Sequence, residues 1–467
     1  MRIRLLGHYF HSSVASLALA EALLFFASVY AAAALRFGTN IDQIASAEGS
    51  LAPRAFVFGG VTLISYLALG LYTSRQRARA AGLGLRVVLA VLAAMAVVAI
   101  LFYLLPDLTI GRGILVIAAG ISLVGSVLIR LVFSRLVDGQ TFKKQVLVYG
   151  YGSRVNAFSK LRRASDRRGY NLVGFVCPPD ESLNVAADEL LVAPEGLRAL
   201  CLEWEVEEVV VAMEDRRKNL PVRELMQCRL AGIHVIDFVA FMERETGRIF
   251  LEALSPSWLI FGTGFRRDGL RMFTSRALDL VASAVLVAVT LPVMALTALA
   301  IWLEDGHKGG GVLYRQERVG LEGKTFELLK FRSMRVNAEV AGQAQWAQQN
   351  DPRVTRIGAF IRKCRIDELP QLLNVLRGDM SLVGPRPERP QFVTALEAKI
   401  PYYEQRHSVK PGIAGWAQLC YPYGASEEDA LQKLQYDLYY VKNNSLLFDL
   451  AILVQTAEVV FLGKGAR

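Results

Sequence analysis

The sequence predicts a membrane protein built from three parts: a transmembrane α-helical bundle, a small α/β domain, and a mainly α-helical domain with a re-entrant membrane helix. Four long apolar stretches fill residues 1–140, whereas residues 141–262 alternate short apolar runs with polar helical segments. Residues 263–467 contain one further apolar run with a proline near its middle. At 467 residues and 53% hydrophobic, the chain has room for about three domains and is too apolar to be wholly soluble.

The four apolar stretches each approach the length of about 20 residues that a helix needs to cross hydrocarbon. Lipid cannot hydrogen-bond an open backbone, so helices are the expected structure. Glu21 lies inside the first stretch, where a carboxylate is costly and often functional, although it could equally face a neighbouring helix and be protonated. The stretches are Val14–Leu35, Ala55–Tyr72, Leu83–Leu105 and Gly113–Phe133.

The orientation of these spans follows from the basic residues that flank them. Lys and Arg concentrate in the cytoplasmic loops of membrane proteins. In this chain they concentrate at the N-terminus, in the second loop and after the fourth span: Arg2, Arg4, Arg75, Arg77, Arg79, Arg135, Lys143 and Lys144. Both ends of the bundle are therefore predicted to be cytoplasmic.

The fifth apolar run, Ala277–Leu303, differs from the first four. Pro292 lies near its middle and removes a helix hydrogen bond. Basic residues lie on both sides of the run, which argues against crossing. We expect a helix over residues 277–303 that enters one leaflet, bends at Pro292 and returns. An ordinary span with a tolerated proline is the alternative.

The middle part, residues 141–262, is predicted to be a small parallel α/β domain of Rossmann-like type. Strand-like runs at residues 145–149, 172–177 and 208–212 alternate with helical segments such as Pro221–Ala231. Gly150 and Gly152 begin a dinucleotide fingerprint, but Val155 stands at its third glycine position. A structural or regulatory role is therefore favoured over dinucleotide binding.

Charge and cysteine usage narrow the function classes. The formal net charge of +10 fits an anionic membrane surface or phosphorylated substrates. Nucleic acid is not an expected partner, because no zinc finger, basic zipper or RNA-recognition signature is present. The five cysteines are scattered without a CxxC pair, which indicates reduced thiols in a cytosolic compartment.

Asp367 and Glu368 are the strongest catalytic candidates. Adjacent acids cannot act as the opposed acid and base of a glycosidase. One can instead attack phosphorus as a nucleophile, while its neighbour holds a divalent cation. In the alternative, Asp367 caps a helix, which leaves the nearby Pro385-Arg386-Pro387 segment unexplained. A guanidinium between two prolines is suited to bind a phosphate or the edge of a nucleotide base.

Basic residues upstream of the acid pair predict a phosphate-binding region. Short β-prone runs at Val312–Tyr314 and Thr325–Leu329, joined through Gly320 and Gly323, predict a hairpin. The basic residues on and after this hairpin form the expected phosphate cradle. They are Arg315, Arg318, Lys330, Arg332 and Arg335.

Three sequence blocks resemble the signatures of the bacterial sugar transferases, the monotopic polyprenyl-phosphate phosphoglycosyl transferases. The blocks are KFRSM (Lys330–Met334), DELPQLLNVLRGDMSLVGPRPE (Asp367–Glu388) and RHSVKPGIAGWAQ (Arg406–Gln418), in the family's order. The resemblance covers roughly Thr274–Arg467. The four spans and the degenerate α/β domain resemble the large architecture of that family, as found in exopolysaccharide systems.

The resemblance implies an activity and assigns roles. Asp367 is expected to be the nucleophile and Glu368 its metal-binding partner, with Mg²⁺ as cofactor. Lys330, Arg332 and Arg386 are then expected to bind the substrate phosphates and nucleotide. The implied donor is a UDP-sugar and the implied acceptor polyprenyl phosphate, usually undecaprenyl phosphate. The products are polyprenyl-diphosphate-sugar and UMP, which makes the reaction the first membrane step of an exopolysaccharide or O-antigen-type glycan.

The resemblance also bears on the membrane. The family's re-entrant helix breaks at a proline matching Pro292, although Leu291 stands here where many members have serine. The expected location is the bacterial cytoplasmic (inner) membrane, in contact with membrane lipids, with the catalytic domain (residues 263–467) on the cytoplasmic face.

Two other functions remain open on the sequence alone. A membrane nucleotide-sugar dehydratase or epimerase also joins spans to an α/β domain, but none of the 16 tyrosines precedes a lysine by four residues, as that chemistry normally requires. A non-enzymatic scaffold for polysaccharide assembly needs no adjacent acids beside a rigid arginine. The transferred sugar, the ligand of the middle domain and the oligomeric state stay open, with a homodimer as one candidate.

Overall fold

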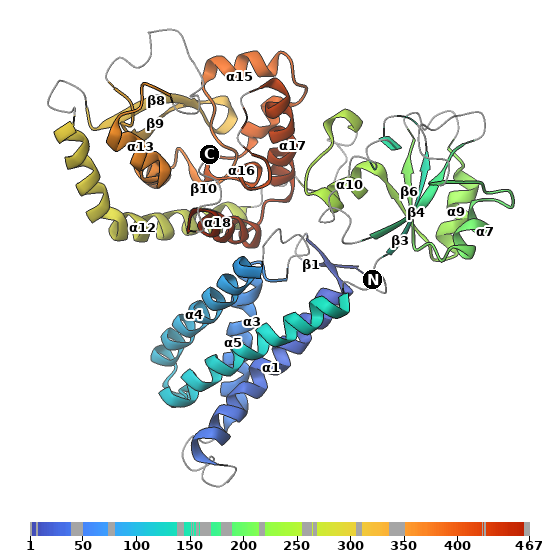
Figure 1. The fold of residues 1–467 in the computed structure, drawn as a ribbon, viewed down its shortest axis with the longest axis horizontal. Coiled ribbons are helices and arrows are strands. Elements are labelled where there is room, and N and C mark those ends of the chain that lie inside the picture. The colour runs from blue at the N-terminus through green and yellow to red at the C-terminus, as the bar shows by residue number, and fades with distance from the viewer. Residues whose placement is uncertain are drawn as a thin grey trace. The chain divides into compact units, whose positions relative to one another are not determined.

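The structure is a computed structural model that divides into two compact units, Met1–Thr246 and Gly247–Arg467 (Figure 1). The residues that it describes are 2–5, 8–38, 50–72, 80–137, 144–150, 152, 154–155, 158, 170–178, 189–213, 220–254, 264, 269–304, 311–335, 351–422, 424 and 426–461.

A bundle of four long helices opens the first unit, after a short hairpin of β1 (Arg2–Leu5) and β2 (His8–His11). The helices are α1 (Ser12–Phe37), α3 (Leu51–Ala68), α4 (Ala80–Leu104) and α5 (Arg112–Val137), with the short η1 (Pro106–Leu108) before α5. Each overlaps one predicted span. Helices α1, α4 and α5 contain stretches long and apolar enough to cross a membrane, whereas the apolar part of α3 is shorter, Leu51–Leu67.

The bundle buries one ion pair, between Glu21 of α1 and Arg130 of α5. The Nε and Nη2 atoms of Arg130 donate to the two carboxylate oxygens of Glu21, at 2.7 and 2.8 Å. Arg130 Nη1 donates to the carbonyl of Leu71, and Ser126 Oγ donates to Glu21 at 2.5 Å. Of the two readings of Glu21, the structure supports the one in which it faces a neighbouring helix.

The middle of the chain forms a five-stranded, all-parallel sheet in the order β5-β4-β3-β6-β7. The strands β3, β4 and β6 match the three predicted runs, whereas the short strands β5 and β7 were not predicted. The bounds are β3 (Lys144–Gly150), β4 (Tyr170–Val176), β5 (Leu190–Leu191), α7 (Leu197–Glu203), β6 (Glu208–Ala212), α9 (Val222–Leu230), β7 (His234–Asp237) and α10 (Phe238–Thr246).

The glycine motif of this domain serves packing. Gly150 has φ +153°, and a Cβ there would lie 2.5 Å from the backbone of Ala212 on the neighbouring strand. Val155, at the position of the third fingerprint glycine, is completely buried. Close approach of β3 to β6 therefore accounts for Gly150 without a nucleotide.

The second unit contains a long apolar helix, an antiparallel hairpin, a two-stranded parallel pair and several helices around them. The hairpin pairs β8 with β9, as predicted, and the parallel pair joins β10 to β11. The elements are η4 (Leu251–Ala253), α12 (Gly269–Glu304), β8 (Leu313–Val319), η6 (Leu321–Gly323), β9 (Thr325–Phe331), α13 (Arg356–Lys363), η7 (Ile366–Glu368), α14 (Gln371–Arg377), β10 (Ser381–Val383), α15 (Pro390–Glu397), η8 (Tyr403–Ser408), β11 (Gly412–Ala414), α16 (Trp416–Cys420), α17 (Glu427–Asn443) and α18 (Leu446–Phe461).

Helix α12 contacts the rest of this unit at both of its ends. Near its start, Arg276 donates to the carbonyls of Val375 and Leu376 at the end of α14, at 2.6 and 2.8 Å. Asp279 accepts hydrogen bonds from Ser381 Oγ and the backbone N–H of Leu382. At the other end, Glu304 accepts from the first two backbone N–H groups of α13. Figure 1 draws α12 as two arms at an angle to each other.

Between its ends α12 remains largely uncovered. It continues as one helix through Pro292, and only 11% of its most apolar window is buried. Its exposed large side chains include Val285, Val289, Leu291 and Leu296. A helix with this much exposed apolar surface requires lipid or another protein around it.

Candidate active site

The two adjacent acids lie on η7, the short turn between α13 and α14. Arg365, which precedes the turn, has φ +59°, a left-handed conformation that is uncommon for a residue with a side chain. This conformation ends α13 and starts the turn that carries Asp367 and Glu368. The helix-capping alternative is wrong, because α14 has Pro370 as its N-cap and receives no side-chain cap from Asp367.

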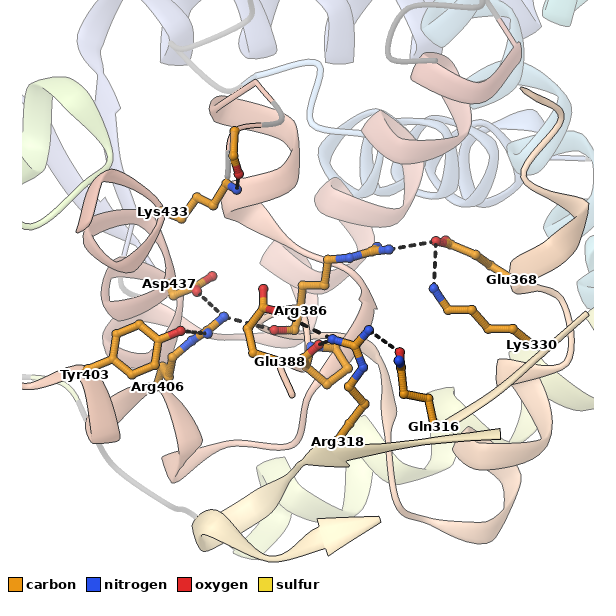
Figure 2. Close-up of polar contacts among 12 residues, drawn as sticks. Gln316, Arg318, Lys330, Glu368, Arg386, Glu388, Tyr403, Arg406, Lys433 and Asp437 are labelled. Carbon is orange, nitrogen blue, oxygen red and sulfur yellow. Dashed lines mark hydrogen bonds and ion pairs between the residues drawn. The ribbon is translucent and has the colours of Figure 1, made fainter. Parts of the chain in front are cut away.

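Glu368 is close to three cationic side chains, of which Figure 2 shows Arg386 and Lys330. Arg386 Nη2 donates to Glu368 Oε1 at 2.9 Å. Arg365 Nη1 and Lys330 Nζ lie 3.5 and 3.8 Å from the same oxygen. Burial favours the neutral carboxyl, but Arg386, Lys330 and Arg365 attract the carboxylate and lower the pKa of Glu368 to about 2. Glu368 is therefore a permanent anion near neutral pH.

Asp367 has a different environment, although it is the next residue. Its side chain is buried, and its Oδ1 atom has no hydrogen-bond partner in the described part of the chain. Burial and the neighbouring charge of Glu368 raise the pKa of Asp367. A buried carboxylate oxygen without a donor is costly, and such groups are candidates for function.

Lys330 reaches the acids from strand β9. Burial, together with repulsion from Arg386 and Arg318, lowers the pKa of Lys330 to about 8, although Glu368 attracts its charged form. The strand is fixed by Asn374 of α14, which is completely buried. The Asn374 side chain accepts from the N–H of Leu329 and donates to the carbonyl of Glu327, at 3.0 and 2.7 Å. The Asn374 side chain thus bonds to β9 as the backbone of a neighbouring strand would, and it fixes the part of β9 that carries Lys330.

The predicted phosphate cradle is only partly assembled around the acids. Arg332 follows β9, and its Nη2 atom is buried with no hydrogen-bond partner in the described segments. Arg315 instead pairs with Glu327 on an exposed face of the hairpin. Arg318 points to the Pro-Arg-Pro segment, where it donates to the carbonyl of Pro387. Of the five basic residues grouped from the sequence, Lys330 is the one that contacts Glu368.

A divalent cation fits the chemistry of this site in part. The described residues contain no cluster of three or more His, Cys, Asp or Glu side chains that could hold a metal. The unpartnered Asp367 Oδ1 and the Glu368 carboxylate are nevertheless hard oxygen donors of the kind that Mg²⁺ prefers. One or two carboxylates suffice when substrate phosphates complete the coordination. Asp379 lies at the far end of α14, where it accepts from Asn374.

Several residues that shape this site were not found from the sequence. Arg406 and Asn374 lie inside the recognised blocks, but spacing alone does not reveal that they bond to backbone groups. The left-handed conformation of Arg365 also carries no sequence signal, because glycine and asparagine are the residues typical of that region.

Comparison with known proteins shows which proteins this chain resembles. A family model described as bacterial sugar transferase matches residues 270–463. The undecaprenyl-phosphate galactose phosphotransferase of Salmonella typhimurium (strain LT2) is 38% identical over 342 residues, which cover 70% of each chain. The UDP-N-acetylgalactosamine-undecaprenyl-phosphate N-acetylgalactosaminephosphotransferase of Aeromonas hydrophila is 43% identical over 245 residues, or 52% of this chain and 56% of that protein.

A third relative extends the range of sugars. The UDP-glucose:undecaprenyl-phosphate glucose-1-phosphate transferase of Xanthomonas campestris pv. campestris is 41% identical over 205 residues, or 44% of this chain and 42% of that protein. The chain thus spans about half of the length of the Aeromonas and Xanthomonas proteins.

Proposed function

Because the chain belongs to the bacterial sugar transferase family, we propose that it transfers a sugar-1-phosphate from a UDP-sugar to polyprenyl phosphate, with undecaprenyl phosphate as the natural acceptor. The products are polyprenyl-diphosphate-sugar and UMP. This is the first membrane step of an exopolysaccharide or O-antigen-type glycan. The observation that carries the proposal is the unequal acid pair, in which Glu368 is bound by three cations while Asp367 Oδ1 has no donor among the described residues.

In the first step Asp367 acts as the nucleophile. A carboxylate oxygen of Asp367 attacks the phosphorus that carries the sugar, and the bond from this phosphorus to the bridging oxygen breaks. UMP leaves with that oxygen, and a sugar-phosphate ester remains on Asp367. The attack requires the ionised carboxylate, so activity should fall as pH drops through the raised pKa of Asp367. The charges of Lys330, Arg332 and Arg386 offset the charge of the phosphoryl oxygens.

In the second step the lipid takes the sugar phosphate. A phosphate oxygen of the polyprenyl acceptor attacks the same phosphorus, and the bond to the Asp367 oxygen breaks. The carboxylate is restored and polyprenyl-diphosphate-sugar is released. Both displacements take place at the same site, so one nucleophile, Asp367, and one set of basic side chains serve both steps.

Mg²⁺ is the proposed cofactor, held by Glu368 with the unpartnered oxygen of Asp367 nearby. When bound, it would neutralise phosphate oxygens of the substrate, as divalent cations do in phosphoryl transfer. The cationic neighbours bind Glu368 through its Oε1 atom. We assign the other carboxylate oxygen, Oε2, to the metal.

The re-entrant course of α12 supports a reaction at the membrane surface. A straight helix of 36 residues would extend about 54 Å, more than the hydrocarbon core of about 30 Å. Its two ends would then lie on opposite sides of the bilayer. Yet Arg276 and Glu304, near the two ends, bond to α14 and α13 of one compact unit. We therefore infer that α12 enters and leaves through one leaflet and bends at Pro292.

The membrane face follows from the charges in the sequence. The bias of Arg and Lys toward both ends of the bundle favours the cytoplasmic side for residues 263–467. Nucleotide sugars are available on that side. A shallow α12 would hold the acids at the height of the lipid phosphate and position the two reactants for attack.

The test is a UMP-release assay on the purified full chain. UDP-glucose, UDP-galactose and UDP-N-acetylgalactosamine form the panel, because the relatives named above differ in their sugar. We expect UMP from at least one donor, dependent on undecaprenyl phosphate for multiple turnover and on Mg²⁺. With the donor alone, mass spectrometry should find a sugar-phosphate on Asp367. A dehydratase or epimerase would change the sugar without releasing UMP, and a scaffold would do neither.

A further inference from the structure

The segment Pro385–Glu388 is held by its backbone carbonyls, all four of which accept a hydrogen bond. Two of the four donors are arginine side chains, of which Arg406 is buried and Arg318 is partly buried, and the other two are backbone N–H groups of neighbouring strands. The four bonds are Gly412 N to Pro385 O (2.9 Å), Arg406 Nη2 to Arg386 O (3.0 Å), Arg318 Nη1 to Pro387 O (3.1 Å) and Val319 N to Glu388 O (2.9 Å).

This arrangement follows from the two prolines. Pro385 and Pro387 lack a backbone N–H, so the segment cannot be fixed by donating along its length as an ordinary strand would. Its carbonyls are the groups left for anchoring, and arginine offers several donors in one plane to reach them. Figure 2 shows the side chains of Arg318 and Arg406 directed at the backbone of the Pro-Arg-Pro segment.

Each of these arginines is in turn fixed by further contacts. Arg406 donates to Tyr403 Oη at 2.6 Å and to Asp437 Oδ2 at 2.8 Å, and its side chain is only 6% exposed. Arg318 donates to Gln316 Oε1 at 2.6 Å, and its Nη1 lies 3.6 Å from Glu388. Both are therefore rigid donors.

We propose that Arg318 and Arg406 are positioning residues for the transferase reaction, which hold the backbone of Arg386 so that its guanidinium stays bonded to Glu368. The inference rests on the proposed function and adds to it. Neither arginine is assigned to substrate. The two bonds hold the successive carbonyls of Arg386 and Pro387, which directly follow the Cα that carries the Arg386 side chain. That side chain reaches Glu368, 2.9 Å away.

The free-energy cost of burying Arg406 and Asp437 indicates a role other than stabilising the fold. A buried ion pair such as Arg406–Asp437 often stabilises a fold no better than apolar side chains of similar volume. Burial raises the pKa of Asp437 to about 6 despite the adjacent guanidinium, which reflects that cost. An apolar replacement could fill the space but could not donate to the carbonyl of Arg386.

The test is a double-mutant cycle between Arg406 and Arg386, measured as UMP release by purified full chain. Arg406→Lys keeps the charge beside Asp437 but lacks the planar set of donors that reaches Tyr403, Asp437 and Arg386 together. We expect kcat to fall about 10- to 100-fold, since small misplacements of a catalytic group have effects of this size, with a smaller change in KM. Arg318→Lys should have a similar but weaker effect.

The cycle separates positioning from folding. If Arg406 acts through Arg386, adding Arg406→Lys to Arg386→Ala should lower kcat less than twofold further. Arg244→Lys is the matched control, because Arg244 is equally buried and bonded to Glu208 in the first unit. It should lower the unfolding temperature but leave kcat per folded protein unchanged.

Three outcomes would overturn the inference. Additive losses in the cycle, or an Arg406→Lys enzyme with wild-type kcat, would overturn it while leaving the transferase function intact. A wild-type protein that releases no UMP from UDP-glucose, UDP-galactose or UDP-N-acetylgalactosamine would overturn the proposed function and this inference together.

Discussion

The bundle and the second unit (Gly247–Arg467, here called the transferase unit) each place a glutamate beside an arginine. The two pairs differ in how many of their hydrogen-bonding atoms are used. In the bundle, both oxygens of Glu21 are bonded by Arg130, and the remaining Arg130 nitrogen donates to a carbonyl. In the transferase unit, Arg386 makes one hydrogen bond to Glu368. The adjacent Asp367 Oδ1 has no hydrogen-bond partner in the described part of the chain.

This difference distinguishes a structural pair from a site. A pair whose donors and acceptors are all matched has no capacity left for a ligand, and its contribution is to fix how α1 and α5 pack. A pair beside a carboxylate oxygen that has no hydrogen-bond partner is energetically unfavourable until a substrate or a metal ion binds that oxygen. The sequence shows an acid in each region, but only the contacts reveal which one is available to react.

The largest expected effect comes from the unmatched oxygen. Asp367→Asn should lower UMP release by more than about 10,000-fold, as loss of a catalytic nucleophile does in other enzymes. The unfolding temperature should stay equal or rise, because the amide removes the repulsion between Asp367 and Glu368. Asp379→Asn, at the far end of α14, is the control and should keep most activity. Near-native turnover by Asp367→Asn would exclude it as the nucleophile.

The matched pair should give the opposite result. Arg130→Met leaves Glu21 buried without its partner, which should cost about 3–5 kcal/mol of stability. The value of kcat per folded protein should not change. The double variant Glu21→Met/Arg130→Met should recover most of the loss, measured by unfolding in detergent. A large fall in kcat at unchanged stability would mean that the bundle pair also serves the reaction.

An intermediate effect concerns the charge of Lys330. Its pKa of about 8 means that the charged form is present below pH 8 and is lost as pH rises above it. At one pH unit above the pKa, kcat/KM for the UDP-sugar should fall about tenfold. Lys330→Arg keeps its charge, so this decline should move to higher pH. An unchanged alkaline limit in Lys330→Arg would assign the limit to another group.

The smallest expected effect tests the attachment of α12. Glu304→Ala removes the acceptor for two backbone N–H groups of α13, which should cost about 1 kcal/mol. Thr355→Ala is the matched control, because Thr355 Oγ1 accepts from Gly358 N at the same helix start, a cap within α13 itself. If Glu304 also fixes α12, its variant should lose more stability than the control and show a measurable fall in kcat. Equal losses of stability in the two variants would mean that Glu304 caps α13 but does not fix α12.

Much of the fold was predictable because it depends on long, regular patterns. The four apolar stretches, the strands β3, β4 and β6 and the β8–β9 hairpin all follow from periodicity and glycine placement. The strands β5 and β7 were missed because one has two residues and the other contains polar His234 and Asp237. The start of α12 at Gly269 was also missed, since its first turns contain Arg271 and Arg276.

Candidate residues for the site could be chosen from the sequence, whereas the residues that support them could not. Asp367 and Glu368 could be chosen as adjacent acids, Arg386 as a guanidinium between two prolines, and Lys330 as a basic residue of the predicted hairpin. Arg318 was grouped with the phosphate ligands, but it bonds to the backbone of Pro387. Contacts between a side chain and a distant carbonyl leave no local pattern, so Arg406 and Asn374 could be found only in three dimensions.

The attachment of α12 at both ends has a consequence for biosynthesis. On the re-entrant course that we propose, α12 returns to the side from which it came, so no later part of the polypeptide has to be translocated. The part of the chain after α12 can then fold on the side of the membrane where it is synthesised, with α12 as its anchor in the lipid. Membrane insertion of α12 and folding of the second unit then take place together.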